Sequence, residues 1–291
     1  MGNAGTWANR LLNHWKLVVA VTLVSLLVVV SSRARRPNIR DLTWAAARRG
    51  DIETLIRYAR AGHRDAFRRL GDPRLGEAEP VLRQFLTVAR SKVYAATALA
   101  KMDVERNLPC LLSLLADPDP EVRDRVIKEL RVYPRWDVAW AIAVHLDDYG
   151  MVRGGCLPSW CVAHTASDTL GWLFAVPGHV FWEEPTGDEM MVAMASGASR
   201  PTAESRSAAL WREWLAEHDG EDFLSIILGN ARREEVMARR TAADRLAQYP
   251  CQESLDCLRE LMDDPHPAIR EEATKSHRRV KEAIARLAGP E

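Results

Sequence analysis

Two segments of the chain that lie 147 residues apart have closely similar sequences. Residues 110–126 read CLLSLLADPDPEVRDRV, and residues 257–273 read CLRELMDDPHPAIREEA. Each contains an apolar stretch, a turn with two prolines, and a second stretch with an Arg. The residue before a proline disfavours the helical conformation, so the first stretch should end as a helix at this turn. A proline is tolerated in the first turn of a helix, so Pro120 and Pro267 should each begin a second helix.

A weaker pattern extends this repeat to more of the chain. A basic residue or His is followed three positions later by a small apolar residue, and often by Leu four positions beyond that. The central residues of this pattern are Ala66, Ala95, Val126, Ala166, Ala209, Ala242 and Ala273. Residues i and i+4 share one face of a helix, and small residues allow paired helices to approach closely. No window alternates polar and apolar residues over the length of a strand, so the predicted fold is all-α.

The DPDPEVR and DDPHPAIR turns, with their Arg-x-x-Ala spacing, resemble HEAT repeats, and in particular the bacterial form named after phycobilin lyase subunits. The resemblance covers about 51–150 and 200–288. It implies a right-handed helical solenoid of helix pairs over 41–291, with an irregular insert at about 147–205. Such solenoids mostly bind proteins. In the two turns, Asp117, Asp119 and Asp264 are expected to cap exposed amides.

Two further resemblances are local. Residues 42–62, LTWAAARRGDIETLIRYARAG, are similar to a single ankyrin repeat and are expected to form the capping end of the solenoid. Residues 206–218 look like a helix found in bacterial HEAT-repeat proteins of unassigned role. Trp211 and Trp214 are therefore expected to be packing residues.

The first 40 residues form a separate part of the chain. They contain six basic residues and no acidic residue, and residues 17–30 read LVVAVTLVSLLVVV. A spanning helix needs about 20 residues, a length that 11–32 supplies if Lys16 extends to the interface. A transmembrane helix at about 15–32 is therefore predicted, with a cleaved signal helix or a buried core helix as alternatives. Basic residues after the segment favour a single-pass protein with a cytoplasmic solenoid over an exported one.

The formal net charge of zero also divides unevenly. Residues 41–291 contain 34 basic and 40 acidic residues, and nucleic-acid binding needs clustered positive charge. Five arginines could form a local basic face: Arg232, Arg233, Arg239, Arg240 and Arg245. The charges of Glu234, Glu235 and Asp244 largely offset theirs. No nucleic-acid partner is expected.

No catalytic constellation is recognisable, since a GxSxG elbow, a phosphate-binding glycine loop and an HExxH motif are all missing from the sequence. Cys110 and Cys257 occupy equivalent repeat positions and are expected to be buried and inert. Cys156, Cys161 and His164 supply three zinc ligands at most, and His145 or His179 would have to be the fourth. A disulfide between these cysteines and plain packing are the alternatives. We expect no enzyme activity, no cofactor and no metal.

The insert at about 147–205 lengthens the spacing of the repeat and is rich in aromatic residues and Met. Insertions in solenoids form loops on one face, often the binding face, and such side chains are enriched in protein interfaces. Candidate contacts to an unknown protein partner are Trp160, Trp172, Trp182, Met190 and Met191. Alternatively, these side chains fill a gap between repeats or line a small-molecule pocket.

The preferred function is a membrane-anchored HEAT-repeat scaffold that mediates protein–protein interaction. One alternative is an enzyme or enzyme subunit that resembles the phycobilin lyases. The other is an exported helical-repeat binding protein.

Overall fold

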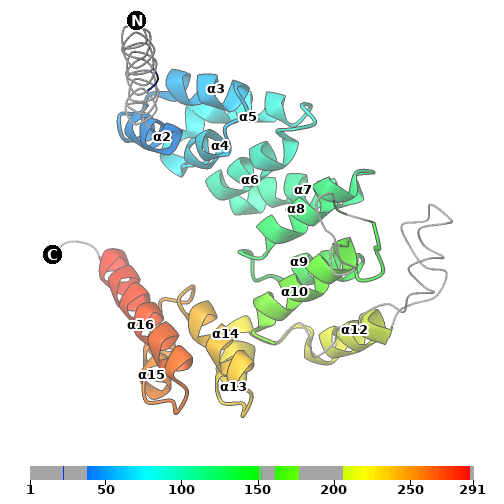
Figure 1. The fold of residues 1–291 in the computed structure, drawn as a ribbon, viewed down its shortest axis with the longest axis vertical. Helices are drawn as coiled ribbons and strands as arrows, with labels where there is room; N and C mark the ends of the chain where they lie inside the picture. The colour runs from blue at the N-terminus through cyan, green and yellow to red at the C-terminus, as the bar shows by residue number, and fades with distance from the viewer. Residues whose placement is uncertain (1–21, 23–37, 151, 153–160, 177–205, 289–291) are drawn as a thin grey trace, which may run out of the picture. The chain divides into compact units, whose positions relative to one another are not determined.

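Helices account for the regular secondary structure in the part of the chain that the structure describes (Figure 1). The structure is a computed structural model, and it describes residue 22 and residues 38–150, 152, 161–176 and 206–288. It divides into an N-terminal unit, residues 1–102, and a C-terminal unit, residues 103–291. Each unit is described by itself below.

The predicted membrane segment lies almost entirely outside the described residues. Of the apolar run at 17–30, the structure describes Thr22 alone. Within the described residues, no helix combines the length and the apolar character needed to cross a membrane.

The N-terminal unit consists of short helices whose ends follow from local sequence. Its elements are α2 (Ile39–Arg48), α3 (Ile52–Arg60), α4 (Arg64–Leu70), the 3-10 helix η1 (Pro73–Ala78), α5 (Glu79–Phe85) and α6 (Lys92–Met102). Gly50 and Gly62 follow α2 and α3 with φ of +68° and +84°, a conformation that favours glycine. The Asp51 carboxylate accepts a hydrogen bond from the Thr54 amide at 3.0 Å and caps α3. Residues 42–62, expected to be the capping end of the solenoid, thus lie in helices α2 and α3, and their likeness to an ankyrin repeat stays a prediction.

The C-terminal unit continues with helices that pack on their neighbours. Its elements are α7 (Val104–Ser113), η2 (Leu114–Ala116), α8 (Pro120–Leu130), α9 (Trp136–Ala143), α10 (Val162–Phe174), α12 (Arg206–His218), α13 (Phe223–Ala231), α14 (Val236–Leu246), α15 (Gln252–Leu261) and α16 (Pro267–Leu287). α13 packs on α14, and α15 packs on α16. The second helices of the pairs also contact one another, α8 with α10, α10 with α14, and α14 with α16. Within its described residues, the expected insert at 147–205 contains the regular helix α10.

The small-residue pattern predicts the core well. Six of its central residues have 0% of their surface exposed: Ala66, Ala95, Val126, Ala166, Ala242 and Ala273. The Leu residues four positions later are equally buried: Leu70, Leu99, Leu130, Leu170 and Leu246. The prediction is wrong for Ala209, which is exposed. α12 instead buries Ala208, because the inward face of this helix is set by the large rings of Trp211 and Trp214.

The proline turns have the predicted form. Pro120 and Pro267 are the first residues of α8 and α16. The Asp119 carboxylate caps α8 by accepting a hydrogen bond from the Glu121 amide at 2.9 Å. Two other carboxylates cap amides inside the turns, with Asp117 accepting from Asp119 at 3.0 Å and Asp264 accepting from His266 at 2.8 Å.

A buried ion pair connects the turn before α8 to the segment after α9. Arg123 donates to both carboxylate oxygens of Asp148, from Nε at 2.6 Å and from Nη2 at 2.9 Å. Its Nη1 donates to the carbonyls of Asp117 and Pro118 at 2.7 and 3.0 Å. Gly150 is required beside this pair, because a Cβ there would lie 2.8 Å from Arg123 Nη2. One guanidinium thus holds its own turn and a carboxylate 25 residues later in the chain.

The same arrangement recurs near the end of the C-terminal unit. Arg239 Nε donates to Asp264 Oδ2 at 2.7 Å, again across 25 residues, and Nη1 of Arg239 donates to the carbonyls of Arg233 and Glu234. Arg270 donates to the carbonyls of Asp264 and Pro265 at 2.7 and 2.9 Å. Arg123 and Arg239 therefore join successive helix pairs, whereas Arg270 binds the carbonyls of its own turn.

Replacing one partner of the buried pair should destabilise the protein in a pH-dependent way. Burial alone would raise the pKa of Asp148, but hydrogen bonds from His145, Arg123 and the Gly150 amide outweigh it and lower that pKa to about 2. We expect Asp148→Asn to lower the free energy of unfolding by about 3–5 kcal/mol at neutral pH. Since the folded pKa is depressed, the ionised carboxylate stabilises the fold above pH ~4, and this contribution is lost as the pH falls toward ~2.

Urea unfolding of the wild type and of Asp148→Asn at several pH values measures both effects. The difference in the free energy of unfolding between the wild type and Asp148→Asn should shrink by about 2 kcal/mol when Asp148 is fully protonated. Roughly half of this decrease should be complete by pH ~3. Lys275→Gln is a control, because its pair with Glu271 is exposed and should contribute less than ~1 kcal/mol. A difference in the free energy of unfolding that is small at neutral pH, or that does not change with pH, would contradict a stabilising role for the ionised Asp148.

Candidate interaction site

Of the five candidate contact residues, the structure describes one. Trp172 lies on α10 and is partly buried. Trp160, Trp182, Met190 and Met191 lie outside the described residues. The surroundings of Trp172 are therefore the place where the predicted interaction site can be examined.

Two guanidinium groups surround the Trp172 ring. The Cζ atom of Arg131, at the end of α8, lies 4.0 Å from the ring centroid. The Cζ atom of Arg245, on α14, lies 5.7 Å from it. Burial lowers the pKa of Arg131, and the charges of Asp244 and Asp168 partly offset this effect. Such cation–π contacts are favourable, by about 0.5–2 kcal/mol each, and here they join three helices.

Arg245 is a buried positive charge with few partners. It has 0% of its surface exposed, and its Nη1 donates to the Arg131 carbonyl at 3.3 Å. Its Nε and Nη2, and the buried hydroxyl of Tyr249, form no hydrogen bond of good geometry with a described residue, although the Tyr249 hydroxyl lies close enough to interact with the Arg245 guanidinium. Burial lowers the pKa of Arg245 and raises that of Tyr249. Arg245 therefore adds buried positive charge beside the Trp172 ring, whereas the partly exposed Arg131 is the guanidinium within reach of an anionic group.

This positive site lies in an acidic part of the chain. Residues 103–291 contain 22 basic and 33 acidic residues. Arg239 is bonded to Asp264, and Arg245 is buried, so neither contributes to an exposed basic face of the kind considered from the sequence.

An aromatic cluster fixes the end of α10. The Phe174 ring lies 4.7 Å from Trp214, 4.8 Å from Phe223 and 5.2 Å from Trp136, measured between centroids. Trp211 has no exposed surface, and its Nε1 donates to the Ser167 hydroxyl at 2.8 Å. Trp211 and Trp214 are thus packing residues, as expected, and the cluster joins α9, α10, α12 and α13.

The cysteine predictions hold in part. Cys257 is 3% exposed, and burial raises the pKa of its thiol to about 11. Cys110, expected to be equally buried, is only partly so. The Cys161 thiol is free and buried, whereas Cys156 lies outside the described residues. His145, a candidate fourth zinc ligand, forms a hydrogen bond between its Nδ1 and the Asp148 carboxylate at 3.2 Å.

The zinc hypothesis gains no support from the residues whose positions are given. Among them, no group of three His, Cys, Asp or Glu side chains is placed to hold a metal ion.

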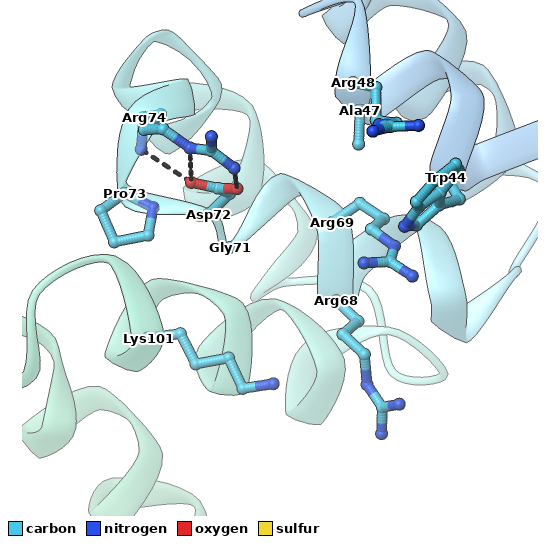
Figure 2. A pocket seen from close by; sticks show the side chains of 10 residues that line it. All are labelled: Trp44, Ala47, Arg48, Arg68, Arg69, Gly71, Asp72, Pro73, Arg74 and Lys101. Carbon is cyan, nitrogen blue, oxygen red and sulfur yellow. Dashed lines mark hydrogen bonds and ion pairs between the residues drawn. The ribbon is translucent and has the colours of Figure 1, made fainter. Parts of the chain in front are cut away.

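A second candidate site, which the sequence reasoning missed, lies within the N-terminal unit. α2, α4, η1 and α6 enclose a pocket of about 630 Å³, shown in Figure 2. The charged or aromatic side chains that line it are Trp44, Arg48, Arg68, Arg69, Asp72, Arg74 and Lys101. The bases are dispersed over more than 50 residues of sequence, so no basic run marks them. Only the folding of four elements brings them together.

Comparison with known proteins agrees with the repeat architecture. Residues 108–132, which include the first proline turn, α8 and Arg123, match the family model described as HEAT repeat. A comparison with curated proteins finds no significant match. The family match covers a single repeat and does not extend to phycobilin lyase subunits or ankyrin repeats. Together with the helical fold it supports a HEAT-repeat protein.

Two arginines on α14 should respond differently to removal of their charge. We expect Arg239→Met to lower the free energy of unfolding by about 3 kcal/mol, because it leaves the Asp264 carboxylate buried without its partner. Arg245→Met should change the free energy of unfolding by less than about 1 kcal/mol, because removal of buried, poorly paired donors offsets the loss of the contacts to Trp172 and to the Arg131 carbonyl. Chemical unfolding of both variants tests this contrast. Equal destabilisation by the two substitutions would show that Arg245 is satisfied internally.

Proposed function

We propose that the protein is a non-catalytic, membrane-attached scaffold that binds a protein partner through the face around Trp172. A HEAT repeat supports an interaction scaffold in general terms. The observation that carries the more specific proposal is the Trp172 ring, partly exposed and flanked by the guanidinium groups of Arg131 and Arg245.

Trp and Arg are the residues that most often dominate binding energy at protein interfaces. A partner segment that combines an apolar side chain with a carboxylate would complement this face. The apolar side chain would contact the exposed part of Trp172, and the carboxylate would accept hydrogen bonds from Arg131, which is partly exposed, and not from the buried Arg245. Because residues 103–291 are otherwise acidic, such a local positive site also favours one docking position over others.

The membrane part of the proposal is supported by the sequence of residues 1–40. An uncharged run of 14 residues is flanked by six basic residues without an acidic one. Attachment at about 15–32 would confine partner binding to one surface and raise the effective concentration of both proteins. The basic flank favours the cytoplasmic side for the scaffold.

Substitution of Trp172 tests the binding face. We expect the full chain to recover its partner after chemical cross-linking, and Trp172→Ala to recover roughly tenfold less or lower still, because loss of an interface Trp costs ~2 kcal/mol or more. Trp140→Ala is the matched control, since Trp140 is also partly exposed but bonds Asp219 and lies on α9. Mass spectrometry of the cross-linked material provides the measurement.

Two further variants make this test decisive. Arg131→Gln keeps the Trp172 ring but removes the guanidinium over it, so it should also weaken recovery. Replacement of 178–204 by a Gly/Ser sequence of equal length keeps α10 and α12 and tests Trp182, Met190 and Met191 separately. Unchanged recovery with Trp172→Ala and Arg131→Gln, in proteins that unfold at the wild-type temperature, would contradict the proposed face.

Fractionation tests the membrane attachment. We expect the full chain to remain in the membrane fraction after alkaline carbonate extraction, because a spanning helix is held by its apolar surface. A chain that starts at Arg33 should instead be released. A full-length chain recovered in the supernatant, or a mature N-terminus at or near Arg33, would exclude the anchor.

A further inference from the structure

We propose that the pocket of the N-terminal unit binds a phosphate-bearing anion. The residues that line the pocket belong to one unit, residues 1–102. This inference is independent of the protein partner proposed above, because the lining residues all lie between 44 and 101.

The lining of the pocket is strongly positive. Arg48, Arg68, Arg69, Arg74 and Lys101 contribute five basic side chains, and Asp72 contributes the one acidic side chain among its described lining residues. The Asp72 carboxylate is paired with Arg74. Its two oxygens accept hydrogen bonds from Arg74 at 3.0 and 2.7 Å, and these bonds lower the pKa of Asp72 to about 2. The basic side chains of the described lining thus outnumber the acidic ones by four.

The arginines are placed to receive a ligand rather than to pair with one another. In Figure 2, Arg68, Arg69 and Lys101 border the same open space, with the Asp72–Arg74 pair at its other side. No described residue accepts a hydrogen bond from Nε of Arg69. Guanidinium groups bind phosphate oxygens through two parallel N–H donors, which makes them well suited to a phosphate group.

Close backbone packing holds the two basic walls at this separation. Gly71 follows α4, and a Cβ at this position would lie only 2.8 Å from the Ala98 carbonyl oxygen of α6. A side chain at residue 71 would therefore push α6, with Lys101, away from α4, with Arg68 and Arg69. The glycine thus keeps the floor of the pocket closed and its bases near one another.

Helix dipoles explain only part of this charge. Arg48, Arg69 and Lys101 lie in the last turns of α2, α4 and α6, where cations are favourable. Each helix end carries roughly half a negative charge, so three ends offset about 1.5 charges. The described lining has a net charge of about +4, which exceeds the roughly 1.5 negative charges of the three helix ends. A bound anion would offset the remaining positive charge.

The size and position of the pocket favour a compact phosphate group over a nucleic-acid chain. A volume of about 630 Å³ holds a phosphorylated headgroup or a small phosphorylated metabolite. Residues 1–102 contain 18 basic and 7 acidic residues, so an anionic group would be attracted to this part of the chain. The phosphate could belong to an anionic phospholipid or to a soluble compound, and the recognition chemistry is the same.

Calorimetric titration of the full chain in a neutral detergent tests the proposal. One arm uses inorganic pyrophosphate, and the other uses mixed micelles with phosphatidylglycerol, compared with phosphatidylcholine. We expect saturable binding in at least one arm. The double variant Arg68→Gln/Lys101→Gln, in which both side chains are exposed, should bind roughly tenfold more weakly or worse.

The matched control removes the same charge elsewhere in the N-terminal unit. Arg60→Gln/Arg90→Gln replaces two exposed bases that do not line the pocket, and it should keep wild-type affinity. Binding of pyrophosphate identifies a soluble phosphate group as a ligand, and binding to phosphatidylglycerol alone identifies a lipid headgroup. If neither probe binds saturably, or if both double variants weaken binding equally, the pocket is not a specific anion site.

A thermal unfolding measurement separates ligand binding from a purely structural role. If the bases only complement helix ends, the pocket variant will unfold at a lower temperature than the control variant, with or without the probe. The proposal requires instead that the probe raises the unfolding temperature of the wild type and of the control, but not that of the pocket variant.

Discussion

The buried Arg–Asp pairs are the interactions on which the arrangement of the C-terminal unit depends. Arg123 and Arg239 each bind the carbonyls of the turn before their own helix and a carboxylate 25 residues later. This geometry fixes both the shape of a turn and its position against the next one. The desolvation of two charges offsets much of their attraction, so such pairs contribute more to a unique arrangement than to net stability. The second helices of the helix pairs, with Ala and Val at their centres, contact one another in the same unit.

Local patterns in the sequence predicted what depends on nearby residues. The proline turns, the helix pairs and the burial of the small residues and Leu follow from steric limits and helix periodicity. The Asp148 partner of Arg123 could not be found this way, because 25 residues, including the whole of α9, separate the two. Ala209 was misassigned because two Trp rings turn α12 to a different face. The basic pocket stayed hidden for a related reason, since its bases come from separate helices and are close only in the folded unit.

The charge of the chain has functional meaning once it is divided by unit. Residues 1–102 contain 18 basic and 7 acidic residues, and residues 103–291 contain 22 and 33, so the zero total is the sum of +11 and −11. The N-terminal unit therefore favours anionic groups, and the pocket concentrates that preference at one place. The C-terminal unit presents Trp172 and its two guanidinium groups within acidic surroundings. Membrane attachment, phosphate binding and partner binding would then occupy separate parts of one scaffold.

A double-mutant cycle on Arg123 and Asp148 is the most direct test of this account. The free energies of unfolding of the wild type, Arg123→Met, Asp148→Asn and the double variant would be compared, with Arg239 and Asp264 as a second cycle. The account predicts a coupling free energy of about 2–3 kcal/mol in both cycles, because each single change leaves a buried partner unsatisfied and the double change does not. Coupling below ~0.5 kcal/mol in both would contradict the claim that these pairs hold successive helix pairs together.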